Sequence, residues 1–315
     1  MKLLMVFPGQ GSQSLAMMAA YQGLPAIQQT FEEASDSLQQ DFWKLAEQGP
    51  VEKLNQTVNT QPLMLVADVA IYRAWQQLGG AVPVLTAGHS LGEYPALVAG
   101  GALALADALR FVRRRAEAMQ QAVPEGVGAI AAIVGLDDAA VVALCAEAAE
   151  DQLVEAANFN CPGQVVVAGH KAAVERALEI AKKRGARRAL LLPMSVPSHC
   201  SLMQPAAEKL SDALQALPLR APSIPVIQNV DARTHGSADE IQHALFRQLS
   251  NPVRWVETIQ EAARQGVTHI LESGPGKVLT GLNKRIDATM QCASLHDTEA
   301  LRKAMTMLAQ HAQAN

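Results

Sequence analysis

The order of strand-like and helix-like segments constrains the fold of this chain more than any other feature of its sequence. Short apolar runs alternate with longer segments of helical pattern through the first part of the chain. We predict strands at Leu3–Phe7 and Val82–Ala87, and helices at Ala26–Gln39, Pro62–Leu78 and Ala106–Gln121. This alternation is typical of a parallel sheet with helices packed against it.

A different order occupies the middle of the chain. The predicted elements there are a strand at 128–136, a helix at 137–150, strands at 153–158 and 164–168, a helix at 171–184 and a strand at 189–193. The order βαββαβ is that of the split, ferredoxin-like unit. We predict a turn at 158–163 between its two central strands. Prolines and glycines on both sides of the unit are typical of crossings between domains.

Beyond this unit the alternation of helices and strands resumes, which predicts a discontinuous large domain. Its later elements are helices at 202–217, 239–249, 253–265 and 277–286, and strands at 226–230 and 269–272. We therefore assign residues 1–124 and 198–315 to the large α/β domain and residues 125–197 to the small one. Residues 311–315 are expected to be a loose end.

The segment Gly88–Gly92, with the sequence GHSLG, follows a predicted strand and precedes a segment of helical pattern at 91–98. In that context G-x-S-x-G is the nucleophile elbow, in which small flanking residues let a strained serine project its hydroxyl. The large domain is accordingly predicted to be α/β-hydrolase-like, with Ser90 as a candidate nucleophile. Glycine and serine are also ordinary loop residues, so the motif alone leaves both interpretations open.

Composition excludes several classes of protein. The 315 residues are 49% hydrophobic and 18% charged, which is typical of a folded globular chain. A net charge of -4 gives no general reason to expect nucleic-acid binding, and no apolar run is long enough to cross a bilayer. The start of the chain, MKLLMVFPGQGSQ, is expected to form a strand and not a signal peptide, because Pro8 and Gly9 end its apolar run early.

The four cysteines are scattered, with no C-x-x-C spacing and no companion histidines; they are Cys145, Cys161, Cys200 and Cys292. Neither a metal site nor a disulfide framework is predicted, and a reducing, cytoplasmic setting is expected. Cys200 lies beside His199 and is a conceivable catalytic thiol, although buried packing is the commoner role of a free cysteine.

A nucleophilic serine needs a base and a group that orients the base. His199 lies where the small domain returns the chain to the large one, and clefts between domains are preferred places for sites. A capping or surface role is equally open for it. His89 is adjacent to Ser90, so packing is its expected role. No acidic residue stands out as a third member, so we expect an amide or a backbone carbonyl to orient the base.

The oxyanion of such a reaction needs hydrogen-bond donors. The backbone N–H of Leu91 is the usual first donor, because Leu91 follows the nucleophile. The loop Pro8–Gln13 is the candidate for the second, since its glycines allow the backbone to approach a ligand closely. The same loop lacks both the lysine of a P-loop and the third glycine of a dinucleotide fingerprint, so we set nucleotide binding aside.

Several blocks of sequence together carry a resemblance to a known family. They are FPGQGSQ at 7–13, QPLMLVADVAIYRAW at 61–75, GHSLGEY at 88–94, NFNCPGQVVVAGH at 158–170, VPSHC at 196–200, NVDA at 229–232, RQLSNPVRW at 247–255 and ESGPGKVLTGL at 272–282. With these blocks in this order, the chain resembles the malonyl-CoA:acyl carrier protein transacylases of fatty acid synthesis and the related acyltransferase domains of polyketide synthases.

The resemblance implies catalytic roles for five residues. Ser90 would be the acylated nucleophile and His199 its general base. Gln248 would supply the oxygen that orients the histidine. Gln10 and Leu91 would supply the N–H groups of the oxyanion hole.

The resemblance also implies substrate-binding roles. Arg115 would hold the free carboxylate of the substrate, since a planar guanidinium binds a carboxylate through two parallel hydrogen bonds. Asn160 and Asn229 would line the cleft. A solvated basic helix face is the usual meaning of a charge run and is our expectation for Arg113 and Arg114; the inward direction of Arg115 rests on the resemblance alone.

The implied reaction is a two-step exchange of a malonyl group through a malonyl-serine intermediate, with no metal and no bound cofactor. The implied partners are malonyl-CoA and holo acyl carrier protein, with no nucleic acid and no membrane. Carrier proteins of this type are acidic, so we expect a basic docking surface; the candidates are Lys182, Lys183, Arg184, Arg187 and Arg188. Cations that complement the dipole at a helix end are an equal alternative for these residues.

Two other classes of function stay open from the sequence. A serine hydrolase for neutral esters would have no use for Arg115. A non-catalytic subunit that binds a carrier protein would have no need of Ser90, His199, Gln248 and Arg115 together. Within the family, a polyketide acyltransferase and a transferase subunit of malonate decarboxylation remain alternatives to fatty acid synthesis.

Overall fold

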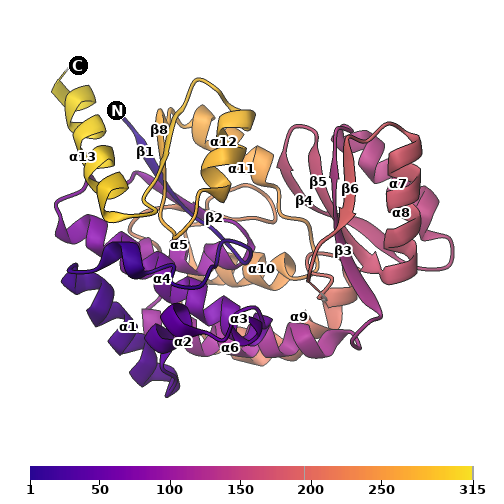
Figure 1. Ribbon diagram of the computed structural model, residues 1–315, viewed down its shortest axis with the longest axis horizontal. Coiled ribbons are helices and arrows are strands. Elements are labelled where there is room, and N and C mark those ends of the chain that lie inside the picture. The colour runs from indigo at the N-terminus through magenta and orange to yellow at the C-terminus, as the bar shows by residue number, and fades with distance from the viewer. Residues whose placement is uncertain (195, 314–315) are drawn as a thin grey trace.

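Two separate sheets organise the chain. The computed structural model describes residues 1–194 and 196–313, with side chains up to 310. Figure 1 shows the large sheet and its helices at one end of the molecule, together with both termini, and the small sheet with α7 and α8 at the other. The α/β class is confirmed. The second sheet lies wholly within residues 128–191, while the domain boundaries at 124/125 and 197/198 stay a prediction.

The large sheet is parallel throughout. Its strand order is β7-β2-β1-β8-β9, where the strands are β1 (Leu3–Phe7), β2 (Leu85–Gly88), β7 (Val226–Ile227), β8 (His269–Glu272) and β9 (Gln291–Ser294). β1 lies in the centre, and the register pairs Phe7 with Gly88. Because the two strands run in the same direction, the loops that follow them emerge at the same edge of the sheet.

Helices cover both faces of this sheet. Alternate residues of β1 belong to two different apolar clusters, so the central strand is buried on both sides. One face packs against α1 (Pro25–Leu38), α4 (Thr57–Gln77), α5 (Glu93–Ala99) and α6 (Leu105–Ala122), and the other against α11 (Trp255–Arg264) and α12 (Val278–Ile286). The remaining helices of this part are α2 (Phe42–Gln48), α3 (Val51–Leu54), α9 (Gln204–Gln215), α10 (Ala238–Gln248) and α13 (Thr298–Gln313).

The small sheet is antiparallel with the order β4-β5-β3-β6, as the βαββαβ pattern predicts. Its elements are β3 (Gly128–Val134), α7 (Asp138–Ala149), β4 (Val154–Cys161), β5 (Gln164–His170), α8 (Lys171–Lys183) and β6 (Arg188–Leu191). One face, with Ala131 and Ile133, packs on α7 and α8. The other face, with Ile130 and Val166, is directed toward the large domain and Cys200.

The structure corrects several predicted elements. Helix α4 begins at Thr57, so Pro62 lies inside it and does not start it. Strand β4 continues through Cys161, which reduces the predicted turn at 158–163 to its last residues. Four elements, α2, α3, β9 and α13, are not predicted from the sequence. Helix α13 continues through Gln313, where a loose end is expected, and residues 314–315 and Ser195 lie outside the described part. Among the described residues, no helix is both long and apolar enough to cross a membrane.

One carboxyl group lies in the core of the large domain without a partner. Asp68 on α4 is fully buried, and neither of its side-chain oxygens has a hydrogen-bond partner among the described residues. Burial, and secondarily the nearby Glu272, raises the pKa of Asp68 well above its ordinary value. Glu272 differs, because its carboxylate accepts bonds from the backbone N–H groups of Leu279 and Thr280 at the start of α12.

We expect the substitution Asp68→Asn to stabilise the protein at alkaline pH. In the unfolded chain this carboxyl ionises near pH 4, whereas in the folded chain it holds its proton to higher pH, so stability is lost as pH rises through that range. The expected gain in the free energy of unfolding at pH 9 is about 1 kcal/mol, which corresponds to an increase in Tm of about 2 °C for a chain of this size. Thermal melts at pH 5 and pH 9 measure it. An equal loss of stability at both pH values would contradict the prediction.

Candidate active site

Ser90 follows β2 at a sharp turn. Its φ of 54° lies in the left-handed region, which is rare for a residue with a side chain. The backbone is crowded on both sides of it: a Cβ on Gly88 would lie 1.8 Å from the carbonyl oxygen of Gly92, and a Cβ on Gly92 would lie 2.0 Å from that of Phe7. The two glycines of the motif are therefore required by packing, and the predicted elbow is present.

Asn229 holds this strained turn in place. Its Oδ1 accepts a hydrogen bond from the backbone N–H of Ser90 at 2.6 Å, and its Nδ2 donates to the carbonyl of Gly88 at 2.5 Å. The side chain is fully buried and lies outside the lining of the cavity described below. The family resemblance implies that Asn229 lines the cleft and binds substrate; its contacts instead place it behind the nucleophile, where it holds the turn.

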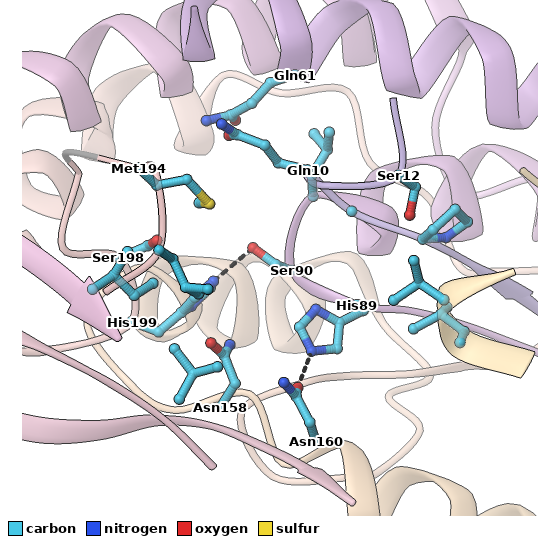
Figure 2. A pocket seen from close by; sticks show the side chains of 18 of the residues that line it. Gln10, Ser12, Gln61, His89, Ser90, Asn158, Asn160, Met194, Ser198 and His199 are labelled. Atoms are coloured by element: carbon cyan, nitrogen blue, oxygen red, sulfur yellow. Dashed lines mark hydrogen bonds between the residues drawn. The ribbon is translucent and has the colours of Figure 1, made fainter. Parts of the chain in front are cut away.

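His199 reaches Ser90 from the segment that returns from the small domain. Its Nε2 lies 2.6 Å from Ser90 Oγ (Figure 2). Its Nδ1 lies 2.9 Å from the backbone oxygen of Gln248. A carbonyl oxygen can only accept, so Nδ1 carries the proton and Nε2 is left to accept from the serine hydroxyl. Of the two orienting groups left open by the sequence, the backbone carbonyl is the one observed.

The environment of His199 keeps its imidazole neutral. The side chain is buried, and this burial, with the positive charge of Arg115 as the next cause, lowers the pKa of His199 to about 3. Its φ of 64° is again in the left-handed region. Both members of the pair thus have strained backbones, a feature that clusters at functional sites.

The loop after β1 lies directly against the elbow. A Cβ on Gly9 would lie 2.6 Å from the carbonyl oxygen of His89 and 3.7 Å from the backbone nitrogen of Leu91. The absence of a side chain at Gly9 therefore allows the backbone of Gln10 to approach that of Leu91, as two donors to one oxyanion require. The Gln10 side chain bonds to α4, where its Oε1 accepts a hydrogen bond from the Thr57 hydroxyl at 2.9 Å.

Ser90, His199 and the loop residue Gln10 line a cavity between the two domains with a volume of about 170 Å³. Figure 2 shows Gln10 and Gln61 on one side of Ser90, with His89 and Asn158 on the other. The small domain contributes the apolar side chains Ile130, Val166 and Leu192. Pockets for drug-sized ligands begin at about 300 Å³, so the expected occupant is a short group.

Arg115 lies at the inner side of this cavity. Its side chain is 1% exposed, while Arg114 is exposed and Arg113 half-buried, so the inward direction predicted for the third arginine of the run is observed. Its Nη1 donates to Gln61 Oε1 at 2.6 Å and its Nη2 to Gln248 Oε1 at 2.9 Å. These bonds use two of five N–H donors, and the two partners are neutral amides. The guanidinium therefore retains both charge and donors for an anionic ligand.

The remaining predicted residues of the site have other contacts. Asn160 lines the cavity, but its Oδ1 lies 2.8 Å from His89 Nε2. His89 also packs on the Trp255 ring, with centroids 5.5 Å apart, in agreement with its expected packing role. Cys200 is fully buried, and burial raises its pKa to about 12, so a thiolate at this position is disfavoured.

The proposed docking cations do not lie at the cavity. Lys182, Lys183 and Arg184 end helix α8, which covers the face of the small sheet opposite to Ile130 and Val166. Two of these cations also pair with acidic neighbours, Lys182 with Glu179 and Arg184 with Glu147. Both observations weaken the prediction that this patch receives a carrier protein.

Two residues of the site, Gln61 and Glu93, are not predicted from the sequence. Gln61 bonds to Arg115, and Glu93 is fully buried with its Oε2 2.6 Å from Gln248 Nε2. Both lie within the quoted sequence blocks, but nothing local marks them as part of the site. Among the described residues, no group of three or more His, Cys, Asp or Glu side chains is placed to hold a metal ion.

Comparisons with known proteins agree with this geometry. A family model described as an acyl transferase domain matches residues 4–305. The malonyl CoA-acyl carrier protein transacylase of Escherichia coli K12 is 54% identical over 303 residues, covering 96% of this chain and 98% of the relative. The protein of the same name from Bacillus subtilis 168 is 42% identical over 309 residues, covering 98% and 97%.

Solved structures are similarly close. An acyl-carrier-protein S-malonyltransferase from Burkholderia pseudomallei 1710b superposes with a TM-score of 0.96 at 55% identity, covering 97% of this chain and 100% of that one. A malonyl-transacylase solved in complex with a type II polyketide synthase acyl carrier protein superposes with a TM-score of 0.96 at 52% identity, covering 98% and 100%.

The environment of His199 predicts an unusual pH dependence. A histidine with an ordinary pKa would lose its function as a base as pH falls through about 6.5, but here the lowered value keeps the imidazole neutral. We therefore expect kcat/KM for acylation of Ser90 to stay level from pH 7 to pH 5. Stopped-flow measurement of the released thiol gives the profile, and an acid limb centred near pH 6.5 would contradict the expectation.

Proposed function

The chain belongs to the acyl transferase domain family, and from this premise we propose that it transfers the malonyl group from malonyl-CoA to the phosphopantetheine thiol of holo acyl carrier protein. The reaction is one of fatty acid biosynthesis, and it passes through a malonyl ester of Ser90. Relatives named for this activity cover nearly the whole chain. We place the enzyme in the cytoplasm.

One observation carries the proposal: a bonded serine–histidine pair and a buried arginine face the same small cavity. The pair supplies nucleophile and base. The arginine supplies a site for the far carboxylate of the acyl group, which acetyl-CoA lacks. A cavity of about 170 Å³ suits an acyl group as short as malonyl.

The first half-reaction acylates the enzyme. His199 Nε2 takes the proton from Ser90 Oγ as the oxygen attacks the thioester carbonyl carbon, and the new C–O bond gives a tetrahedral oxyanion. The backbone N–H groups of Gln10 and Leu91 donate to this oxyanion; a single such donor is typically worth a factor of about 100 to 1,000 in rate. The C–S bond then breaks, and the imidazolium returns its proton to the coenzyme A sulfur.

Substrate binding also makes His199 a better base. The positive charge of Arg115 is one cause of the low pKa of His199 in the free enzyme. When the malonyl carboxylate pairs with the guanidinium, that charge is offset and the imidazole can accept a proton more readily. Recognition of the acyl group and activation of the nucleophile are therefore linked.

The second half-reaction repeats these steps with a different thiol. The phosphopantetheine thiol of the carrier protein loses its proton to His199 and attacks the serine ester. The C–O bond of the ester breaks, and Ser90 Oγ recovers the proton from His199. The acyl group leaves as a thioester of the carrier protein, and the free enzyme is restored.

Mass spectrometry and kinetics of two variants test the proposal. Incubation with malonyl-CoA is expected to add one malonyl group at Ser90, with none in Ser90→Ala and little from acetyl-CoA. Loss of the bonds between Arg115 and the carboxylate should lower kcat/KM for malonyl-CoA about a hundredfold in Arg115→Ala.

The substitution Arg114→Ala serves as the matched control, because Arg114 is the exposed neighbour of Arg115 on α6. Its kinetics should match those of the unmodified enzyme. Full activity of Arg115→Ala, or a malonyl group on another residue, would refute the proposal.

A further inference from the structure

Glu93 is a buried acid that contacts Gln248 and has no part in the reaction described so far. Its side chain is fully buried at the start of α5, three residues after the nucleophile. Oε2 accepts from the Gln248 side-chain nitrogen at 2.6 Å and from the backbone N–H of Asn229 at 3.4 Å. Oε1 has no hydrogen-bond partner among the described residues.

The Gln248 side chain connects this acid to the substrate arginine. Its Oε1 accepts from Arg115, while its Nε2 donates to Glu93 and, at 2.9 Å, to the backbone oxygen of Ser90. Arginine can only donate and a backbone carbonyl can only accept, so the amide has one possible orientation. Arg115 and Glu93 thus interact through an amide placed between them.

The order Arg115, amide, Glu93 has a consequence for charge. A direct ion pair would occupy the guanidinium and compete with a substrate carboxylate. With the amide between them, Arg115 still lines the cavity and keeps N–H donors that the two amides do not use. The net charge of the buried pair then depends on whether Glu93 carries a proton. Protonated Glu93 leaves the full positive charge of Arg115 for the substrate, whereas ionised Glu93 offsets it.

We infer that Glu93 is a positioning residue that acts through Gln248, and that it must be protonated for Arg115 to bind an acyl group with a free carboxylate at full strength. The proton lies on Oε1, since Oε2 already accepts two bonds. This inference rests on the proposed function in one respect, namely that Arg115 receives the malonyl carboxylate.

Other charged and titratable groups face Glu93 and determine when it ionises. Burial is the largest influence and raises the pKa of Glu93 to about 8; Asp231 raises it further, whereas the bond from Gln248 and the charge of Arg115 lower it. Tyr94, next to it on α5, stays neutral at these pH values because burial raises its pKa to about 12. His199 is neutral in this range as well. Glu93 is therefore the group of this cluster that changes charge near pH 8.

The pH profile of acylation tests the inference. For the unmodified enzyme, kcat/KM for malonyl-CoA should fall above about pH 8, by a factor that approaches about ten per unit of pH. Glu93→Gln keeps the shape and an acceptor for Gln248 but cannot ionise, so its profile should stay level to pH 9.5. Slow acylation by acetyl-CoA, which has no carboxylate, should lack the alkaline limb in both proteins.

The substitution Glu117→Gln is the matched control, since Glu117 is an exposed glutamate on α6. Its profile should keep the alkaline limb. The inference is overturned if Glu93→Gln keeps the limb at the same midpoint, or if acetyl-CoA shows the same limb in the unmodified enzyme. A purely structural role of Glu93 would change stability and rate at every pH and leave the midpoint unmoved.

Proton uptake gives a second measurement that does not require a change at Glu93. Calorimetric titration of Ser90→Ala with malonyl-CoA at pH 8.5, in buffers of different ionisation enthalpy, should show net uptake of a proton that is absent at pH 6.5 and absent with acetyl-CoA. Binding without proton uptake at pH 8.5 would overturn the inference. Failure of the unmodified enzyme to form a malonyl-serine would instead refute the proposed function, so the two failures are distinct.

Discussion

The hydrogen bonds of Gln248 hold the site together. Its backbone oxygen fixes the His199 tautomer, and its side chain bonds to Arg115, to Glu93 and to the backbone of Ser90. One residue at the end of α10 thereby sets the position of the base, the turn of the nucleophile and the substrate arginine. A change in any of these groups is transmitted to the others, because buried polar networks tolerate few unpaired members.

Backbone strain at the two reacting residues is balanced by contacts from distant segments. Ser90 and His199 both have positive φ angles, and each is held by a group far away in sequence, Ser90 by Asn229 and His199 by Gln248. The parallel sheet makes this possible, because β1 and β2 deliver the Gln10 loop and the elbow to the same edge. The small domain then closes the cavity with apolar side chains. The side chains of Arg115 and His199 are thereby buried, and charges interact more strongly in a buried site than in water.

The sequence predicted those features that depend on local pattern. The parallel sheet follows from alternation and the elbow from its glycines, while the roles of Ser90 and His199 as a pair follow from the resemblance that the sequence blocks carry. What it could not provide depends on contacts across the chain: the clamp at Asn229 joins residues 139 positions apart, and the bond from Gln248 to Ser90 joins residues 158 apart. Pro62 was misassigned for a similar reason, because the buried packing of α4 outweighs the local preference of proline for a helix start.

The central claim is that one acyl group is held at both ends, by Arg115 at its carboxylate and by the backbone of Gln10 and Leu91 at its carbonyl. A crystal structure of the enzyme trapped as its malonyl ester tests this most directly. The expected result is a carboxylate within hydrogen-bond distance of the guanidinium and an ester carbonyl oxygen that faces the two backbone N–H groups. A malonyl group whose carboxylate points to solvent, away from Arg115, would contradict it.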